Sequence, residues 1–497
     1  MEELIVVLRE TNLLYYISLI ALPLLFLILK QIKSPSNLPP GPFPWPIVGN
    51  ILNMGSKPHI SLAQLAKSHG PLISLRLGTQ LVVVGSSQAA AKEILKTHDR
   101  ILSARCVPRV IPVYPDQLHL SMAWVECNDQ WRYLRTLCRT ELFSAKMIES
   151  QASVRDKKTN ELVEFLANNE GKLVKIGDVV FATVFNMLSN IFVSKDFISL
   201  EEESEDGGMK GLLRRFMELG SAPNLADFYT ILSGLDLQGI TKKSKEMLGQ
   251  VNGAWGVITK QRRADKGNDV LRQRDFLDSL LDSELDDDQI NYLLQELFLA
   301  GADTSTSTVE WAMVELIKNP KAMRKVCAEL ERETSGHIVK ESDLPRLPYL
   351  HFTVNETLRL HPPAPFLLPH RALETCKVMN YTIPKDCQVL VNAWAIGRDP
   401  NTWEDPLSFK PERFLDSGMD LNSGNFKFIP FGAGRRICPG LPMAAKQVTL
   451  ILACLINCFE WSLPHSMLPS ELDMDDKFGI TLHKEKPLLL IPKVRKA

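Results

Sequence analysis

The apolar residues of this chain recur every three or four positions over most of its length, as they do along one face of an α-helix. This periodicity predicts helices at 87–99, 129–143, 147–169, 254–266 and 446–461. A mainly α fold is therefore expected.

Two short runs depart from the helical period. "PLISLRLG" at 71–78 and "QLVVVGS" at 80–86 are rich in β-branched and other apolar residues and have glycine at the turn between them, which is typical of paired strands. We therefore expect one hairpin and a small β region beside the helices.

A longer helix of roughly thirty residues is predicted between Asp286 and Pro320, because an acidic start precedes a helical apolar pattern and a terminal Asn-Pro. Its middle is unusual. Gly301 and the hydroxyl-rich stretch 303–308 are less favourable in a helix than Ala by up to about 1 kcal/mol each. These residues are expected to serve a purpose other than helix stability.

The amino-terminal part is the most apolar. Residues 11–29 form an uncharged stretch of 19 residues, long enough to cross a hydrocarbon layer of ~30 Å as a helix. Lys30 and Lys33 follow it, so the positive-inside rule places the rest of the chain on the cytoplasmic side. A cleaved signal peptide is the alternative, but the span is long and no small-residue cleavage site is evident.

We therefore assign 1–33 as a membrane anchor. Six prolines between Pro35 and Pro46 predict a proline-rich hinge at 34–46 that acts as an extended, semi-rigid spacer. No linker, repeat or low-complexity tract interrupts the remainder, so 47–497 is expected to be one large folded unit.

Composition and charge exclude several other classes of protein. The chain has 497 residues, of which 45% are hydrophobic, an ordinary globular composition. Its formal net charge of -1 indicates no basic surface for nucleic acid. Its nine cysteines are scattered and include no C-x-x-C pair, so neither a disulfide framework nor a zinc module is indicated.

One cysteine stands in an unusual setting, "PFGAGRRICPG" at 430–440. Thiolate, rather than thiol, binds metals, so Cys438 would need surroundings that favour the anion. The glycines of this stretch allow backbone N–H groups to point at the sulfur. A helix beginning near Leu441 would also place its N-terminal dipole beside the thiol. A buried structural cysteine is the alternative.

Together with four other motifs, this stretch resembles the haem-thiolate monooxygenases of the cytochrome P-450 family, specifically its plant members of the endoplasmic reticulum. The other motifs are "WRYLR" at 131–135, "AGADT" at 300–304, "NETLRLHPP" at 355–363 and "PERF" at 411–414. The resemblance covers the whole chain. It implies the cytochrome P-450 fold, with haem b between the long distal helix and the proximal cysteine loop.

The resemblance also implies roles for individual residues on the proximal side. Cys438 is the expected axial ligand of the haem iron. Trp131, Arg135, His370 and Arg436 are the expected contacts of the two haem propionates. For an isolated arginine, a solvated surface position would be the alternative.

On the distal side, the resemblance implies that Asp303 and Thr304 are catalytic and deliver protons during oxygen activation. Gly301 is expected to leave room over the iron. For an isolated pair, a Thr bonded to its i−4 carbonyl and an Asp on a solvated face would be the simpler interpretation.

Two further sets of residues follow from the resemblance. A structural ion-pair clamp behind the haem is expected from Glu356, Arg359 and Arg413. An apolar wall of the substrate pocket is expected from Ala302, Ala364, Phe366 and Leu367. Ordinary core packing is the alternative for each residue of that wall.

Longer stretches such as "EILKTHDRILSARC" look like the plant alkaloid branch, which includes N-methylcoclaurine 3'-hydroxylase. This likeness implies hydroxylation of a benzylisoquinoline alkaloid with dioxygen and with electrons from NADPH, passed on by a separate cytochrome P-450 reductase. The reductase is expected to dock on a basic face near Lys427 and Arg435. Phenol coupling or rearrangement of an aporphine- or tropane-type alkaloid shares every motif and stays open. A non-catalytic haem-binding membrane protein is the remaining alternative.

Overall fold

The structure is a computed structural model, and it describes residues 37–111, 120–201, 208–232, 234–265, 274–415, 417–421 and 424–495. The predicted anchor at 1–33 and the first residues of the proline-rich hinge lie outside the described residues.

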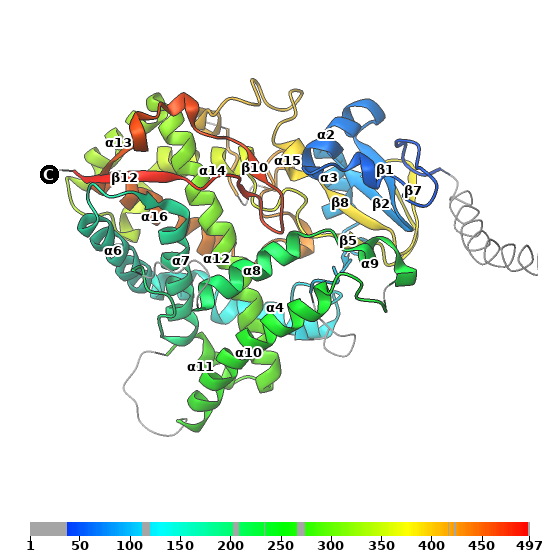
Figure 1. Ribbon diagram of the computed structural model, residues 1–497, viewed down its shortest axis with the longest axis horizontal. Helices are drawn as coiled ribbons and strands as arrows, with labels where there is room; N and C mark the ends of the chain where they lie inside the picture. Colours follow the sequence, from blue (N-terminus) through cyan, green and yellow to red (C-terminus); the bar gives the residue numbers. More distant parts are fainter. Residues whose placement is uncertain are drawn as a thin grey trace, which may run out of the picture.

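The described chain is mainly helical, with a small sheet gathered at one end (Figure 1). Its central element is α12 (Asp287–Lys318), whose amino terminus is closed by a capping box between Asp286 and Gln289. The long helix predicted from the sequence is confirmed. Helices that pack against it include α7 (Ile176–Val193), α10 (Ile240–Ala264), α14 (Pro348–Leu360) and α16 (Leu441–Cys458).

The other predicted helices are also present, with different bounds. The segment 87–99 forms α3 (Gln88–Lys92) followed by a π-helical turn at Glu93–Thr97, and 147–169 is divided between two helices. The helix predicted at 446–461 ends at Cys458, and its last three residues belong to the strand β9 (Phe459–Ser462). The remaining α-helices are α2 (Pro58–His69), α3 (Gln88–Lys92), α4 (Asp129–Glu141), α5 (Ala145–Ser150), α6 (Ala152–Asn168), α8 (Gly208–Ser221), α9 (Leu225–Phe228), α11 (Phe276–Leu281), α13 (Pro320–Thr334) and α15 (Ala393–Ile396).

The predicted hairpin is confirmed as β1 (Leu72–Leu77) and β2 (Gln80–Gly85), which pair antiparallel with Leu72 opposite Gly85. It is one edge of a five-stranded sheet in the order β1-β2-β8-β5-β3. The added strands are β3 (Ala104–Arg105), β5 (His370–Arg371) and β8 (Gln388–Val391). The other strands are β4 (Val174–Lys175), β6 (Cys376–Val378), β7 (Tyr381–Ile383), β9 (Phe459–Ser462), β10 (Asp476–Lys477), β11 (His483–Lys484) and β12 (Leu489–Val494).

The described part of the proline-rich segment lies against this sheet. The backbone N–H of Ser74 in β1 donates to the carbonyl of Pro40 at 2.9 Å, and the Ser74 hydroxyl donates to the carbonyl of Pro39 at 2.6 Å. Because Gly41 would bring a Cβ to 1.9 Å from the Ser74 carbonyl oxygen, only glycine allows so close an approach. From Pro39 onward the expected spacer is therefore docked on the body.

Two described helices, α7 and α16, are long and apolar enough to cross a membrane. Their most apolar windows are 78% and 67% buried inside the protein. Both helices belong to the large hydrophobic cluster that also contains the interior face of α12. Core packing accounts for their composition.

Candidate active site

The Cys438 loop is folded tightly onto the body of the protein. The backbone N–H of Cys438 donates to the carbonyl of Phe431 at 3.0 Å, which closes the loop. Gly434 has a φ of +70°, and a Cβ there would lie 1.8 Å from the carbonyl oxygen of Leu95. Since an L side chain would be strained and would collide at this position, the glycine fixes how the loop docks.

The Cys438 thiol is accessible although protein atoms surround it closely. Burial raises the pKa of this thiol, whereas the backbone N–H groups of Gly440 and Leu441 and the guanidinium of Arg135 favour the thiolate. Gly440 caps α16, so the expected N–H groups come from the start of that helix. A metal bound to sulfur would complete the deprotonation.

Three arginines come together beside the cysteine loop. The guanidinium carbon atoms of Arg135 and Arg436 lie 5.7 and 5.1 Å from the ring centre of Trp131. Both side chains, and that of Arg105, donate to backbone carbonyl oxygens. Among the described residues, the ion pairs of the structure include none with these three guanidinium groups. Burial and the neighbouring arginines lower the pKa of Arg105 to about 9.

This cluster fits a doubly anionic ligand. Buried cations are costly unless an anion compensates them, and here Arg105, Arg135 and Arg436 repel one another. The two propionates of haem would supply the missing negative charge beside Cys438. The predicted residues Trp131, Arg135 and Arg436 are thus brought together, and the structure adds Arg105.

His370 is placed beside the same cluster but presents a different atom. Its Nδ1 lies 2.6 Å from the carbonyl oxygen of Leu102, and burial together with Arg105 lowers its pKa to about 3. The ring is therefore neutral, Nδ1–H donates to Leu102, and Nε2 is an acceptor. An acceptor does not bind a carboxylate, so a propionate contact by His370 stays a prediction that requires a second proton on the ring.

On α12, the side chains alternate between an open and a packed side. Ala300 is exposed and Thr304 half-buried, and the Thr304 hydroxyl donates to the Ala300 carbonyl at 2.7 Å. Ala302 is 2% exposed and lies in the hydrophobic core. It does not line an open pocket as expected, because two positions along a helix point to opposite sides.

Gly301 also has a role other than the one predicted. A Cβ at Gly301 would lie 2.9 Å from Cδ1 of Leu188 in α7. The glycine therefore allows α7 and α12 to pack closely, and the space that it leaves faces α7 instead of the open side of the helix.

Asp303 forms an ion pair with His483 in β11. The distance between Asp303 Oδ2 and His483 Nε2 is 3.0 Å, and the two side chains are 14% and 35% exposed. Asp303 is therefore not an unpaired carboxylate, and it does not lie on a solvated face of the helix. Sequence reasoning did not single out His483.

The predicted clamp is confirmed. Glu356 receives two hydrogen bonds of 2.7 Å from Arg359, and Arg413 Nε lies 2.9 Å from the same carboxylate. Glu356 and Arg359 have fully buried side chains. The clamp joins α14 to the turn at Pro411–Phe414 and has a structural role.

The three remaining residues of the expected substrate wall have different surroundings. Leu367 adjoins the cysteine loop, with its Cδ1 3.6 Å from where Gly432 would carry a Cβ. Ala364 is half-buried. Phe366 is 9% exposed and its ring lies 5.8 Å from that of Phe478, within the apolar cluster next to the sheet.

A residue that the sequence analysis missed ties the open side of α12 to the segment before Trp131. The carboxylate of the half-buried Glu296 accepts hydrogen bonds from the backbone N–H groups of Met122 and Ala123 at 2.8 and 3.3 Å, and from the Ser121 hydroxyl. Burial raises the pKa of Glu296 to about 7. Its only sequence signal was an acid within the apolar stretch 293–299.

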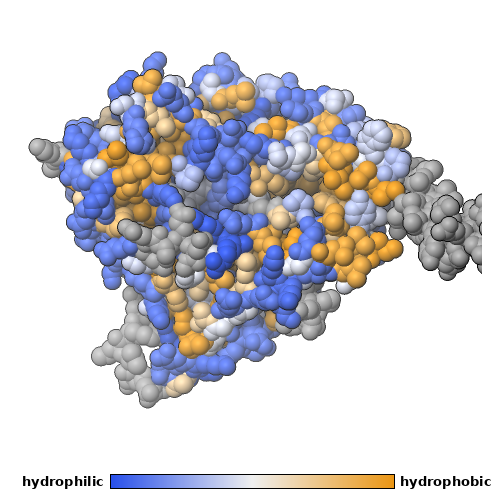
Figure 2. Space-filling model, viewed as in Figure 1, coloured by the Kyte–Doolittle hydropathy of each residue, from blue (hydrophilic) through white to orange (hydrophobic). Residues whose placement is uncertain are grey.

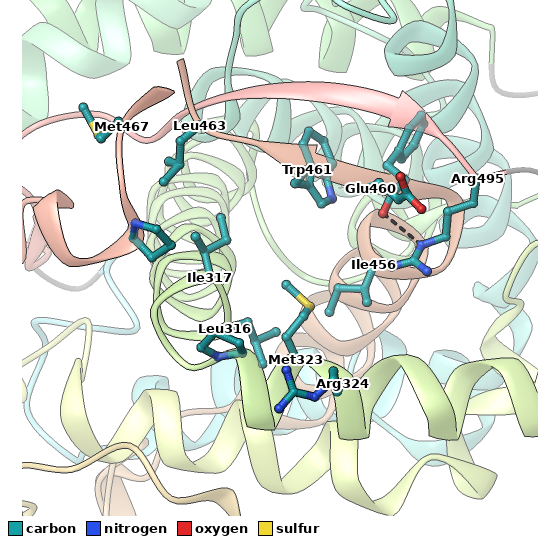
Figure 3. Close-up of a pocket in the computed structure, with 13 residues that line it drawn as sticks. Leu316, Ile317, Met323, Arg324, Ile456, Glu460, Trp461, Leu463, Met467 and Arg495 are labelled. Atoms are coloured by element: carbon teal, nitrogen blue, oxygen red, sulfur yellow. Dashed lines mark hydrogen bonds between the residues drawn. The ribbon is translucent and has the colours of Figure 1, made fainter. Parts of the chain in front are cut away.

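A separate pocket of about 420 Å³ lies between the carboxyl-terminal end of α12, α13 and β9 (Figure 3). Ile317, Met323 and Trp461 give it an apolar lining, and Arg324 and Arg495 lie at its edge. It contains none of the residues that the sequence analysis selected. The candidate active site is therefore the region between α12 and the Cys438 loop.

Comparison with known proteins adds independent findings. The family model for Cytochrome P-450 matches residues 39–491. The chain is 54% identical to the probable (S)-N-methylcoclaurine 3'-hydroxylase isozyme 2 of Coptis japonica, over 95% of this chain and 96% of that protein. It is 52% identical to (S)-N-methylcoclaurine 3'-hydroxylase isozyme 1 of Papaver somniferum, over 95% and 98%. Corytuberine synthase of Coptis japonica is 46% identical, over 96% and 98%.

Proposed function

Because the chain belongs to the cytochrome P-450 family, we propose that it is a haem-dependent monooxygenase that hydroxylates a benzylisoquinoline alkaloid. The observation that carries the proposal is an accessible Cys438 thiol beside the buried Arg105 and the half-buried Arg135 and Arg436. The substrate class rests on the relatives that are named N-methylcoclaurine 3'-hydroxylases and share about half of this sequence.

In this proposal Cys438 would hold a haem as a thiolate that the N–H groups of Gly440 and Leu441 favour. Arg105, Arg135 and Arg436 would hold its carboxylates by charge-assisted hydrogen bonds. A haem held by these residues would supply the activation of dioxygen.

The open side of α12 would provide protons and shape. The Thr304 hydroxyl donates a hydrogen bond to the Ala300 carbonyl, and its oxygen keeps lone pairs that can accept a hydrogen bond from a proton donor. Asp303 is the adjacent acid. The small side chain of Ala300 leaves space above the helix. Leu367 adds an apolar side chain next to the cysteine loop.

A second candidate is oxidative phenol coupling, because corytuberine synthase is 46% identical along almost the full chain. The two reactions differ in the fate of oxygen. Hydroxylation puts one atom of isotopically labelled dioxygen into the product, whereas coupling puts in none. Label in the product supports our proposal, and a coupled product without label contradicts it.

We further propose that the protein is held at the endoplasmic reticulum membrane by residues 1–33, with the hinge at 34–46 and the catalytic unit at 47–497 on the cytoplasmic side. An exposed apolar surface supports this orientation. It comprises Phe43, Trp45, Leu52, Ile231 and Leu237. Figure 2 shows hydrophobic surface at the end of the molecule where the described chain begins.

The two parts of this surface belong together. The carbonyl of Phe228, three residues before Ile231, accepts hydrogen bonds from the N–H and hydroxyl of Thr79 at 2.9 and 3.1 Å, and the carbonyl of Val48 accepts one from Gly78 at 3.3 Å. Both segments thus meet at the turn of the β1–β2 hairpin. A lipid surface would cover apolar side chains that are otherwise left in water.

Electrons are proposed to come from NADPH through a separate cytochrome P-450 reductase. The expected docking face includes Arg435, which is exposed and pairs with Asp99 at 3.2 Å, and Lys427. Since this attraction would be electrostatic, turnover with added reductase should fall as salt rises.

The proposed function is tested by expressing the chain in microsomes with a plant reductase. Reduced enzyme with carbon monoxide should show the red-shifted Soret band of thiolate-ligated haem. Products from a panel of benzylisoquinoline and tropane alkaloids, read by mass, should include a hydroxylated benzylisoquinoline. A spectrum of histidine-ligated haem, or no product from any panel member, would contradict the proposal.

A further inference from the structure

His483 is held beside α12 by hydrogen bonds of the preceding residue, Leu482. The carbonyl of Leu482 accepts a hydrogen bond from the Ser307 hydroxyl at 2.8 Å, and the Leu482 N–H donates to the carbonyl of Pro363 at 2.8 Å. Asp303 and Ser307 are four residues apart and therefore lie on one side of the helix. The Ser307 hydroxyl thus holds the segment of β11 against α12, and the Asp303 carboxylate of the same helix contacts the His483 imidazole.

The imidazole reaches from solvent to the proposed catalytic acid. Its Nε2 lies 3.0 Å from Oδ2 of Asp303, and 35% of the side chain is exposed, against 14% for Asp303. The residue after Asp303 is Thr304, whose side chain belongs to the open side of α12. The ring is therefore placed between bulk water and the acid.

Charged groups from two other elements face this imidazole. They are Asp303 and Glu310 on α12 and Lys477 on β10, opposite His483 in the strand pair. Burial on its own lowers the pKa of His483, but the two carboxylates outweigh burial and Lys477, so the pKa is raised above its usual value. Glu310 is itself fixed, because it accepts the Leu488 N–H at 2.8 Å. These carboxylates thus favour the charged imidazolium more than water would.

We propose that His483 is a positioning residue that connects Asp303 to solvent and so controls proton supply to the Thr304 side of α12. The proposal rests on the proposed monooxygenase function. In the transfer, the N–H bond at Nε2 breaks and an O–H bond forms at Oδ2, which leaves a neutral imidazole and a carboxylic acid. The acid passes its proton on toward Thr304, and the ring takes a proton from water.

The contact itself is tested first, without turnover. The pKa of His483 is measured in the haem-loaded full chain from deuterium exchange at the imidazole C2 carbon, followed peptide by peptide with mass spectrometry. Asp303→Asn should lower this pKa by about one unit, because an adjacent opposite charge shifts a titration by that order. If the pKa of His483 is the same in the variant, the ion pair does not exist in solution and the proposal is overturned.

The function of the contact is tested with His483→Gln, which keeps a hydrogen-bonding side chain but cannot carry a proton. Product formed per NADPH consumed should fall about tenfold, with peroxide released instead, and the solvent deuterium isotope effect on product formation should rise. In the parent enzyme, coupling should decline as pH rises through the raised pKa of His483, because the imidazolium is lost. This alkaline limb should be absent in the variant.

A matched control is available in the same chain. His337 and Asp343 form an ion pair with the same Nε2–Oδ2 distance of 3.0 Å, between the end of α13 and the following turn. His337→Gln should leave coupling and the isotope effect unchanged. The inference about His483 would be overturned, without affecting the proposed function, if both substitutions changed coupling equally. The same holds if His483→Gln left coupling and the isotope effect unchanged in an enzyme that hydroxylates normally. A parent enzyme without the carbon monoxide band or product would instead contradict the proposed function.

Discussion

Glu296 offers a direct test of how the distal helix holds the segment before Trp131. Glu296 is half-buried, and its carboxylate accepts hydrogen bonds from the backbone N–H groups of Met122 and Ala123. The carbonyl groups of Met122 and Val125, in the same segment, accept hydrogen bonds from the guanidinium of Arg436. Replacing Glu296 with Gln keeps the shape of the side chain and removes its charge.

The expected magnitude follows from the pKa of Glu296. Burial raises it from the usual 4.5 to about 7, so the folded chain binds this proton more tightly than the unfolded chain. Stability therefore falls as pH rises from about 4.5 to 7, and the loss persists above that range. A shift of about 2.5 units corresponds to roughly 3 kcal/mol. Glutamine has no such cost, so Glu296→Gln should match the parent near pH 4.5 and be more stable by up to about 3 kcal/mol at pH 8.

Thermal unfolding of the haem-loaded chain, at one scan rate and at several pH values between 5 and 8, measures this difference. With about 2.1 cal/mol/K per residue, a chain of 497 residues has an unfolding entropy near 1 kcal/mol/K, so Tm should rise by about 3 °C at pH 8. Glu412→Gln is the control, and its effect on Tm should have the opposite sign. Glu412 forms an exposed ion pair with Lys325, and the pKa of Glu412 is lowered. A Tm difference for Glu296→Gln that is constant with pH, or negative at pH 8, would refute the reasoning.

Four further substitutions test other parts of the site. Cys438→Ala should abolish the carbon monoxide band of thiolate-ligated haem, as read by difference spectroscopy. Arg105→Leu should speed haem loss about tenfold, measured by transfer to apomyoglobin, because one cation near the propionates disappears; unchanged haem retention would exclude Arg105 from the site. Glu356→Ala should destabilise the chain by about 3 to 5 kcal/mol in denaturant unfolding, since it leaves a buried arginine without its acid. Gly301→Ala should lower Tm, and Leu188→Ala in the same chain should restore part of the loss if packing against α7 is the reason for the glycine.

Sequence patterns sufficed where the signal is local. The capping residues and period of α12, the β1–β2 hairpin and the turn around Cys438 each lie within one continuous stretch. The family resemblance of the motifs predicted the clamp centred on Glu356, and the ion pairs with Arg359 and Arg413 are present as expected.

Contacts between distant short segments were not predictable in the same way. Arg105 joins the arginine cluster because β3, only two residues long, pairs with β5 and sets Arg105 opposite His370. His483 meets Asp303 through another two-residue strand. Strands this short carry no periodic signal, since a two-residue alternation occurs everywhere in a sequence. Ala302, which the resemblance implied for the substrate pocket, is instead buried in the hydrophobic core.

The hydroxyl-rich middle of α12 shows how structural and chemical demands share one helix. The Ser305 hydroxyl accepts a hydrogen bond of 2.6 Å from Gln447 of α16, and the Ser307 hydroxyl donates to Leu482 beside His483. Ser305 and Ser307 are less favourable in a helix than Ala, but each fixes a neighbouring element, whereas Ala300 and Thr304 belong to the open side. Residues in the β10–β11 segment can therefore alter proton supply through the position of His483, while leaving the helix and the substrate surface unchanged.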